Sequence, residues 1–254
     1  MASEARRSNG AISAMADGRV WAQPFRSRVA YIDNDSVFLA EGMDEINQPI
    51  RRFDIDSRGH IWITRISGVM TEYKDTILRS YDTDFFSTTN FASYSGYADT
   101  SGIVWLAYDS IMVRIDSSGD NQSWIIRNEE YKFNSARVVF ISPSQNKYVY
   151  NSLVALRFMG DSSKVVFNAE IAGNLENFRI LNLLVTSDEE ILIATSQGAF
   201  RVKEHADGSI THEHFLAGKS VGKVFEDSEG NLWFSTLNDG LYMLTEASRQ
   251  VVNI

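Results

Sequence analysis

One pattern recurs six times along this chain, at intervals of about 42 residues, and limits what the chain can fold into. Its clearest copy is EDSEGNLWFSTLNDGLYML (226–244), where an acidic turn precedes a Trp among β-forming residues and a Gly–apolar pair follows. The six anchor positions are Trp21, Trp62, Trp105, Tyr148, Leu192 and Trp233. They are spaced by 41, 43, 43, 44 and 41 residues. A fixed period of this length predicts a repeat architecture.

Each repeat contains four short segments with the composition of β-strands. Around Tyr148 they are SARVVFI (135–141), YVY (148–150), LVALRF (153–158) and KVVF (164–167). Short runs rich in Val, Ile, Phe and Tyr, bounded by polar turn formers, favour strands over the helices of a helical solenoid. Four antiparallel strands per repeat are typical of a propeller blade. The chain is therefore predicted to be all-β, a β-propeller of about six four-stranded blades or part of a seven-bladed one.

The period also predicts the domain organisation. Residues 1–254 are expected to form a single domain, with approximate blades 10–46, 47–89, 90–133, 134–176, 177–217 and 218–254. The first segment, AISAM (11–15), suits an innermost strand, and the last, QVVNI (250–254), suits an outermost one. Six blades would then close directly. The alternative is that a blade or more is missing, which would leave an open arc with exposed sheet edges.

The residues around each anchor have expected structural roles. The Asp that opens a turn such as DSEG (227–230) should accept N–H groups two or three residues further on, and the Gly should take a positive φ. The anchor side chain should fill the wedge between neighbouring sheets. An Asn precedes four anchors by 14 or 15 residues and is expected to stabilise a turn: Asn47, Asn90, Asn134 and Asn177.

Composition excludes several classes of function. The chain has 24 basic and 33 acidic residues, a net charge of −9, and no Lys/Arg cluster, so no nucleic-acid partner is expected. It has no Cys, which excludes disulfides and Cys-based zinc sites. No run of 18 apolar residues is present, so no membrane span is predicted in this chain, and its first residues do not resemble a signal peptide. The chain is therefore expected to be cytoplasmic or a piece of a longer exported protein.

The repeat resembles the two-component regulator propeller family. DSEGNLWFSTLNDGLYML (227–244) matches that family's pattern almost position by position, and DSRGHIWITRISGV (56–69) and DTSGIVWLAYDSIM (99–112) match in part. The first repeat keeps only Gly18 and Trp21, and the fourth and fifth agree in spacing and hydrophobic pattern.

This resemblance implies a periplasmic, extracytoplasmic sensing segment of a Bacteroidetes-type sensor histidine kinase. It implies a small-molecule or glycan ligand, or receptor homodimerisation, and no cofactor. In that family a β-sandwich, a membrane helix and a kinase follow the propeller. No kinase motif occurs in these 254 residues, so this chain is not expected to be an enzyme.

Two alternatives remain open, a protein-interaction propeller and a metal-dependent enzyme similar to the streptogramin lyases. The candidate metal ligands are His212 and His214, which would share one face of a strand. A third ligand would be needed, and Asp207 and Glu204 are the only acids nearby. The alternating polar pattern favours an exposed outermost strand instead, whereas the resemblance places lyase ligands at the entrance of the central channel.

Propellers usually bind ligands around the channel mouth, through loops between the second and third strands and links between blades. In this chain the loops between second and third strands contain the predicted ligand-binding residues Arg26, Arg65, Asp109, Asn151, Gln197 and Asn238. Any of them could instead be an ordinary polar turn residue.

Overall fold

The computed structural model describes most, but not all, of the chain. The described residues are 12–14, 19–25, 28–41, 49–55, 59–65, 69–81, 93–98, 103–108, 111–116, 118, 120–126, 138–142, 144–186, 188–227, 229–245 and 251–253. The chain divides into two compact units, Met1–Ile125 and Ile126–Ile254, and each unit is described by itself. Within the described residues, no helix has the length and apolar character needed to cross a membrane.

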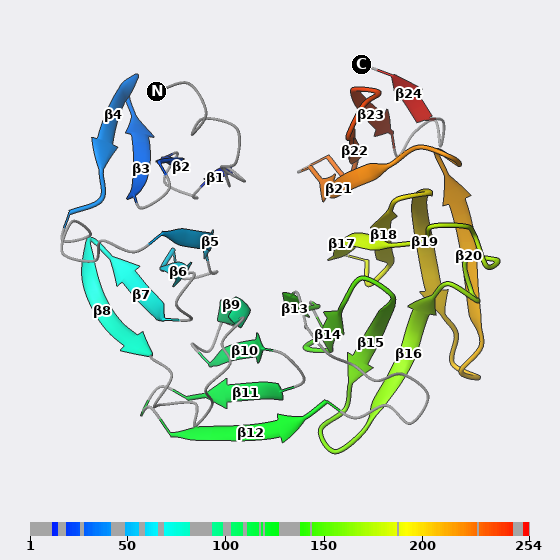
Figure 1. The fold of residues 1–254 in the computed structure, drawn as a ribbon, viewed down its shortest axis with the longest axis horizontal. Helices are drawn as coiled ribbons and strands as arrows, with labels where there is room; N and C mark the ends of the chain where they lie inside the picture. The colour runs from blue at the N-terminus through cyan, green and yellow to red at the C-terminus, as the bar shows by residue number, and fades with distance from the viewer. Residues whose placement is uncertain are drawn as a thin grey trace. The chain divides into compact units, whose positions relative to one another are not determined.

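The described residues of the first unit form three four-stranded antiparallel sheets (Figure 1). Sheet A contains β1 (Ile12–Ala14), β2 (Val20–Phe25), β3 (Arg28–Asp33) and β4 (Ser36–Leu39). Sheet B contains β5 (Ile50–Ile55), β6 (Ile61–Arg65), β7 (Met70–Lys74) and β8 (Thr76–Tyr81). Sheet C contains β9 (Ser93–Ala98), β10 (Val104–Tyr108), β11 (Ile111–Ile115) and β12 (Asn121–Ile125). In every sheet, strands adjacent in sequence are also hydrogen-bonded neighbours.

The second unit repeats this plan three more times (Figure 1). Sheet D contains β13 (Val138–Ile141), β14 (Lys147–Tyr150), β15 (Val154–Phe158) and β16 (Ser163–Asn168). Sheet E contains β17 (Ile180–Val185), β18 (Ile191–Thr195), β19 (Gly198–Glu204) and β20 (Ile210–Phe215). Sheet F contains β21 (Val221–Glu226), β22 (Leu232–Thr236), β23 (Leu241–Leu244) and β24 (Val251–Asn253).

The all-β prediction with four strands per repeat is confirmed in the described residues. All six anchors occupy the same place, the second residue of the second strand of their sheet. The predicted single domain and its blade boundaries stay a prediction.

Four of the six anchors pack between successive sheets within a unit. Trp21 of sheet A is buried with Phe53 and Ile63 of sheet B, and Trp62 of sheet B is buried with Val104 and Leu106 of sheet C. In the second unit, Tyr148 packs in the same cluster as residues of sheet E, and Leu192 packs with residues of sheet F. Full burial of a large apolar side chain stabilises a fold by roughly 1.5–3 kcal/mol. The spacing of the repeat therefore places one such contact in each of these sheet pairs.

The turn between the first and second strands has one geometry in sheets D, E and F. In each turn the first residue accepts an N–H from the fourth residue, at 2.9, 3.1 and 3.1 Å. Its side-chain oxygen accepts an N–H from the fifth, with Ser142, Thr186 and Asp227 in this role at 3.2, 3.0 and 2.8 Å. Asp227 also accepts from the third residue, Glu229 N, at 2.9 Å. The predicted hydrogen bond from the N–H two residues after Asp227 is therefore present. The second bond to its carboxylate comes from the N–H four residues after it, because the turn closes around the fourth residue.

The fourth residue of each turn has a positive φ whether or not it is Gly. Gly230 has φ 80°, as predicted, while Gln145 and Glu189 have φ 64° and 66°. An L-residue in the left-handed region costs roughly 1–2 kcal/mol. Sheets D and E therefore keep the turn geometry without the Gly of the motif.

The four repeated Asn residues can be followed only at Asn177. It has φ 54°, and its backbone carbonyl accepts the hydroxyl of Ser196 at 2.7 Å. Stabilisation of a turn by the Asn side chain stays a prediction. Asn47, Asn90 and Asn134 lie outside the described residues.

Candidate ligand-binding rim

The six predicted ligand-binding residues fall into three groups. Arg26 and Asp109 lie outside the described residues. Arg65 ends β6 in the first unit. Asn151, Gln197 and Asn238 lie in the second unit, in the β14–β15, β18–β19 and β22–β23 connections.

Arg65 lies inside the first unit. Only 1% of it is exposed, and its backbone N–H donates to Val69 O at 2.9 Å. Burial lowers the pKa of the guanidinium from its ordinary value, because the charged form loses hydration. Its role in ligand binding stays a prediction.

Asn151 and Gln197 use their side chains to build the surface on which they lie. The Oδ1 of Asn151 accepts the N–H groups of Leu153 and Val154 at 2.8 and 2.9 Å. The Nε2 of Gln197 donates to Glu176 O at 2.9 Å, which ties the β16–β17 link to the β18–β19 turn. These bonds are structural, and ligand contact by either residue stays a prediction.

Backbone hydrogen bonds join these connections into one surface. Ile180 N donates to Ser152 O at 2.8 Å, which links sheets D and E. Gly218 N donates to Gln197 O at 3.3 Å, which links sheets E and F. Within those two sheets, Ser196 N donates to Arg179 O and Leu237 N donates to Ser220 O, both at 2.9 Å. We call this surface the rim: it consists of residues 151–153, 174–179, 196–197, 216–220 and 237–240.

Several rim side chains face solvent. Leu153 and Leu237 are 55% and 66% exposed, and Arg179 and Asn238 are also exposed. In the described part of the chain, the guanidinium of Arg179 forms no hydrogen bond or ion pair. Two leucines, one guanidinium and one amide offer both apolar and hydrogen-bonding contacts. Sequence reasoning missed Leu153 and Leu237 because it considered only polar loop residues. It missed Arg179 because that residue lies in the β16–β17 link, and the residues it named all came from loops between second and third strands.

Lys219 and Asp239 supply further charge on the rim. Their Nζ and Oδ2 atoms lie 3.5 Å apart, and Nζ also lies 5.5 Å from the ring centroid of Tyr242. The Tyr242 hydroxyl, followed by Asp239, raises the pKa of Lys219 above its ordinary value. Lys219 therefore keeps its positive charge throughout the neutral range.

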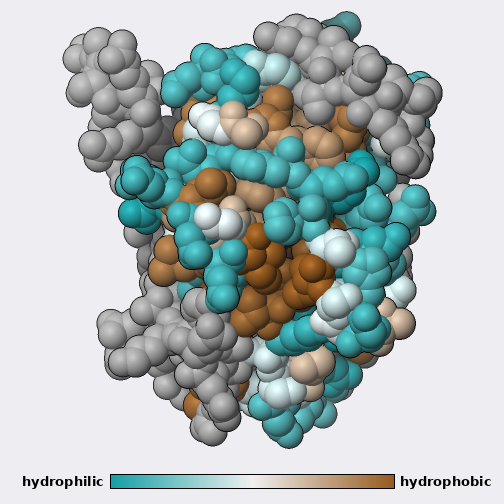
Figure 2. All heavy atoms as spheres, turned by 90° about the vertical axis from the view of Figure 1, so that its right-hand side faces the viewer, coloured by the Kyte–Doolittle hydropathy of each residue, from teal (hydrophilic) through white to brown (hydrophobic). Residues whose placement is uncertain are grey.

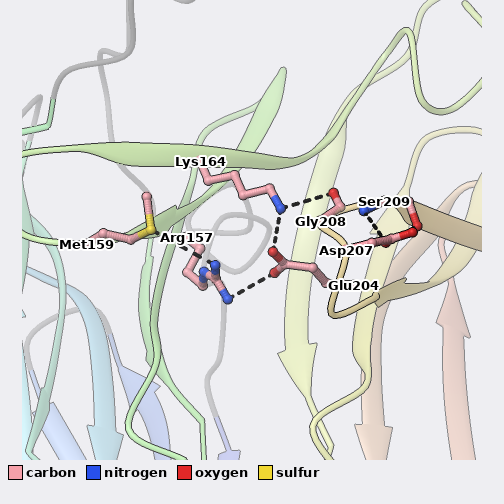
Figure 3. Close-up of polar contacts among 7 residues, drawn as sticks. All are labelled: Arg157, Met159, Lys164, Glu204, Asp207, Gly208 and Ser209. Carbon is pink, nitrogen blue, oxygen red and sulfur yellow. Dashed lines mark hydrogen bonds and ion pairs between the residues drawn. The ribbon is translucent and has the colours of Figure 1, made fainter.

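The side of the second unit that carries the β15–β16 and β19–β20 turns differs from the rim, because its charged side chains form ion pairs with one another. Figure 3 shows the Glu204 carboxylate between Arg157, whose Nη1 lies 3.1 Å from Oε2, and Lys164, whose Nζ contacts Oε1. Lys164 Nζ also donates to Gly208 O at 3.2 Å. Since Arg157 and Lys164 belong to sheet D and Glu204 to sheet E, this cluster clamps two sheets together.

Glu189 forms a second clamp between these two sheets. Its Oε1 accepts the N–H of Ser144 from the turn of sheet D. Burial would raise the pKa of Glu189, but the hydrogen bonds from Ser144, Ser142 and Asn146 outweigh it and hold the pKa below its ordinary value. The sheet D turn, which lacks the Asp of the motif, thus receives its carboxylate from the following repeat.

The histidine pair lies on β20, the last strand of sheet E, as the sequence predicted. His214 stacks on Phe200 with ring centroids 4.1 Å apart, and its Nε2 lies 2.9 Å from Gln197 O. His212 lies 5.8 Å from Phe200 between centroids. Within the described residues, no three His, Cys, Asp or Glu side chains are grouped to hold a metal ion. The contacts of His214 are those of a packing residue.

The comparisons with known proteins agree with this architecture. The family model described as two component regulator propeller matches residues 216–238, which confirms the resemblance in the last repeat. No curated protein matches the chain in sequence.

Solved structures share the fold. The extracellular domain of a hybrid two component system from B. thetaiotaomicron has a TM-score of 0.74 and 16% identity, over 96% of this chain and 32% of that one. A second such domain from that organism has a TM-score of 0.68 and 17% identity, over 94% of this chain and 34% of the other.

A virginiamycin B lyase from Staphylococcus aureus, in a catalytically inactive form with quinupristin, has a TM-score of 0.75 and 15% identity, over 95% of this chain and 82% of the lyase. Identities this low show the fold alone, which is that of a β-propeller. The chain spans about a third of the length of the two B. thetaiotaomicron chains.

Proposed function

We propose that this chain is an extracytoplasmic ligand-sensing propeller segment of a two-component sensor. The observation that carries the proposal is the two component regulator propeller match at residues 216–238. It is supported by the likeness in fold to extracellular domains of hybrid two component systems. In this proposal the parent protein sits in the cell envelope, and other parts of it carry the signal onward.

We place the ligand on the rim. On the turn side of sheets D and E, Arg157, Lys164 and Glu204 are engaged with one another. On the rim, Leu153, Arg179, Leu237 and Asn238 face solvent above a backbone held by hydrogen bonds. A ligand with both apolar surface and hydroxyl or anionic groups suits these side chains, and an oligosaccharide fragment is the class we favour.

The second candidate is a metal-dependent lyase, favoured by the likeness to virginiamycin B lyase over 82% of that enzyme. Its chemistry would need metal ligands gathered at one point. The only residues of this kind predicted from the sequence, His212 and His214, lie on an outer strand, and His214 is held by Phe200 and Gln197. We therefore propose a binding function without catalysis.

A thermal-shift screen of the purified chain against oligosaccharides tests the proposal. Ligand at 100 times Kd stabilises a protein by about 2.7 kcal/mol, which corresponds to a rise of roughly 5–10 °C in Tm for a chain of this size. Arg179→Ala should reduce the shift. Lys203→Ala should not, since Lys203 is an exposed cation of β19 outside the rim. Turnover of a streptogramin B antibiotic with added divalent metal would instead establish the lyase.

A further inference from the structure

The outer edge of sheet A is apolar and exposed. β4 is the last strand in the order of that sheet, and all four of its residues, Ser36–Leu39, are exposed. Val37, Phe38 and Leu39 have exposed fractions of 69%, 44% and 42%. An edge strand presents unpaired N–H and C=O groups, so an apolar one is a template for another strand.

Four other outer strands, β8, β12, β16 and β20, carry polar or charged side chains that protect such an edge. β8 contains Arg79, β16 contains Lys164 and β20 contains the sequence THEH (211–214). The exposed side chains of β12 include Asn121, Gln122 and Ser123. Figure 2 shows hydrophilic side chains over much of the second-unit face, around a hydrophobic patch at its centre. β4 has no charged side chain, which distinguishes it from β8, β16 and β20.

The register of the β3–β4 hairpin determines which backbone groups of β4 point outward. Its two turn residues, Asn34 and Asp35, have φ 45° and 62°, and Ala40 N donates to Val29 O at 3.0 Å. In an antiparallel pair, inward and outward groups alternate along the strand. Since Ala40 is bonded inward, Phe38 and Ser36 are also bonded inward, and the N–H and C=O groups of Val37 and Leu39 point away from β3.

We propose that β4 pairs with β4 of a second copy of this chain, antiparallel and about a two-fold axis at Phe38. In this register Val37 lies opposite Leu39 of the second copy, and the reverse pair forms across the axis. In both Val37–Leu39 pairs, each residue donates its outward N–H to the outward C=O of the other residue. The two pairs therefore form four backbone hydrogen bonds between the copies. The two sheets A join into one continuous sheet.

A row of aromatic side chains leads to this axis. Trp21 and Tyr31 have centroids 4.8 Å apart, and Tyr31 stacks on Phe38 at 5.2 Å with an interplanar angle of 21°. These residues lie opposite one another on adjacent strands. In the dimer, Phe38 of each copy would meet Phe38 of the other and extend this row across the interface.

The strand is complementary to itself, which is why we assign a second copy as its partner. The outward residues Val37 and Leu39 are symmetric about Phe38, so a two-fold axis closes the contact without leaving an edge open. The flanking charges oppose association, because Asp35 lies opposite Glu41 of the second copy. Association should therefore strengthen as salt screens these acidic pairs. This proposal does not depend on what the rim binds.

Analytical ultracentrifugation of the whole chain, over a range of concentrations and salt, tests the proposal. The wild type should show a reversible monomer–dimer equilibrium that shifts toward dimer at higher salt. Val37→Pro removes an outward N–H and leaves the β3–β4 hydrogen bonds intact. Val37→Lys places a charge beside the two-fold axis. Each substitution should weaken dimer association at least tenfold. Glu41→Lys should strengthen it roughly threefold or more, because two Lys–Asp35 pairs replace two repulsive ones.

Leu78→Lys is the matched control, since Leu78 is 46% exposed on β8, the outer strand of sheet B. It should leave the equilibrium unchanged. A chain that stays monomeric under all conditions overturns the proposal. So does equal weakening by Val37→Lys and Leu78→Lys, and a weaker dimer in Glu41→Lys would exclude the antiparallel register.

Discussion

The indole Nε1 of Trp233 donates a hydrogen bond of 2.8 Å to the Oδ2 of Asp227, six residues earlier. The same carboxylate accepts N–H groups of Glu229 and Asn231, so the anchor and its turn are fixed by one side chain. The indole of Trp233, followed by Asn231 and the turn N–H groups, lowers the pKa of Asp227 from 3.8 to about 2. In the last repeat, the Asp and the Trp are therefore one structural element.

Asp227→Asn should make the stability of the fold depend less on pH in the acidic range. Because the folded pKa lies below the ordinary value, these bonds stabilise the fold above about pH 4, and their contribution is lost as pH falls toward 2. Above pH 4 the variant should unfold a few degrees below the wild type. Thermal unfolding at pH 6, 4, 3 and 2 measures this, and a difference that persists unchanged at pH 2 would contradict it.

Gln145→Gly should stabilise the chain by about 0.5 kcal/mol, because Gln145 has φ 64° and Gly adopts that conformation without a Cβ clash. The control is Ser144→Gly in the same turn, which should be destabilising because it adds freedom to the unfolded chain and removes the side-chain hydrogen bond from Ser144 to Glu189. Conversely, Gly230→Ala should lower the free energy of unfolding by about 1 kcal/mol. This cost comes from the positive φ of the backbone, since a Cβ added there meets no atom within 4 Å. Denaturant midpoints compare the three variants, and a destabilised Gln145→Gly would refute the argument.

Glu189→Gln should destabilise the second unit by about 0.5–1.5 kcal/mol, since the charged acceptor for Ser144 N–H is lost. The loss should disappear at acidic pH, because the lowered pKa of Glu189 means that its contribution is present above its unfolded pKa and fades as pH falls. Asp188→Asn is the matched control, an exposed neighbour in the same turn. Equal effects of the two substitutions at pH 7 would rule out a specific contact between the Glu189 carboxylate and the sheet D turn.

Gly198→Ala should destabilise by about 2 kcal/mol or more. A Cβ at Gly198 would lie 2.4 Å from His214 Nε2 and 2.7 Å from Phe215 O, in a residue with φ 126°. Gly160→Ala, also at positive φ but with no atom within 4 Å of the added Cβ, should cost clearly less. Thermal unfolding of both variants provides the comparison; similar losses would mean that the His214 contact is not tight.

Local sequence predicted the fold because each repeat carries its own strand, turn and anchor signals. The position of Trp233 and the positive φ of Gly230 follow from residues close in sequence. The sequence did not identify Glu189 as the acceptor of the Ser144 N–H in the sheet D turn, because Glu189 belongs to the next repeat, 45 residues from Ser144. Its signal was indirect: the turn SPSQN (142–146) lacks the Asp of the motif.

The rim was harder to predict, because polarity alone does not say which way a loop side chain points. Asn151 and Gln197 look like ligand contacts in the sequence but bind the backbone of their own connections. Leu153 and Leu237 look like strand residues but lie exposed beside the strand ends. Arg65 looks like a loop residue in the sequence but is the last residue of β6 and is buried.

Hydrogen–deuterium exchange with and without the oligosaccharide that gives the largest thermal shift tests the sensing proposal most directly. We predict slower exchange in residues 151–153, 174–179 and 237–239, with the turns at 142–146 and 205–209 unchanged. Slower exchange confined to those turns, or no protected rim segment with a ligand that binds, would contradict the assignment of the rim as the sensing surface.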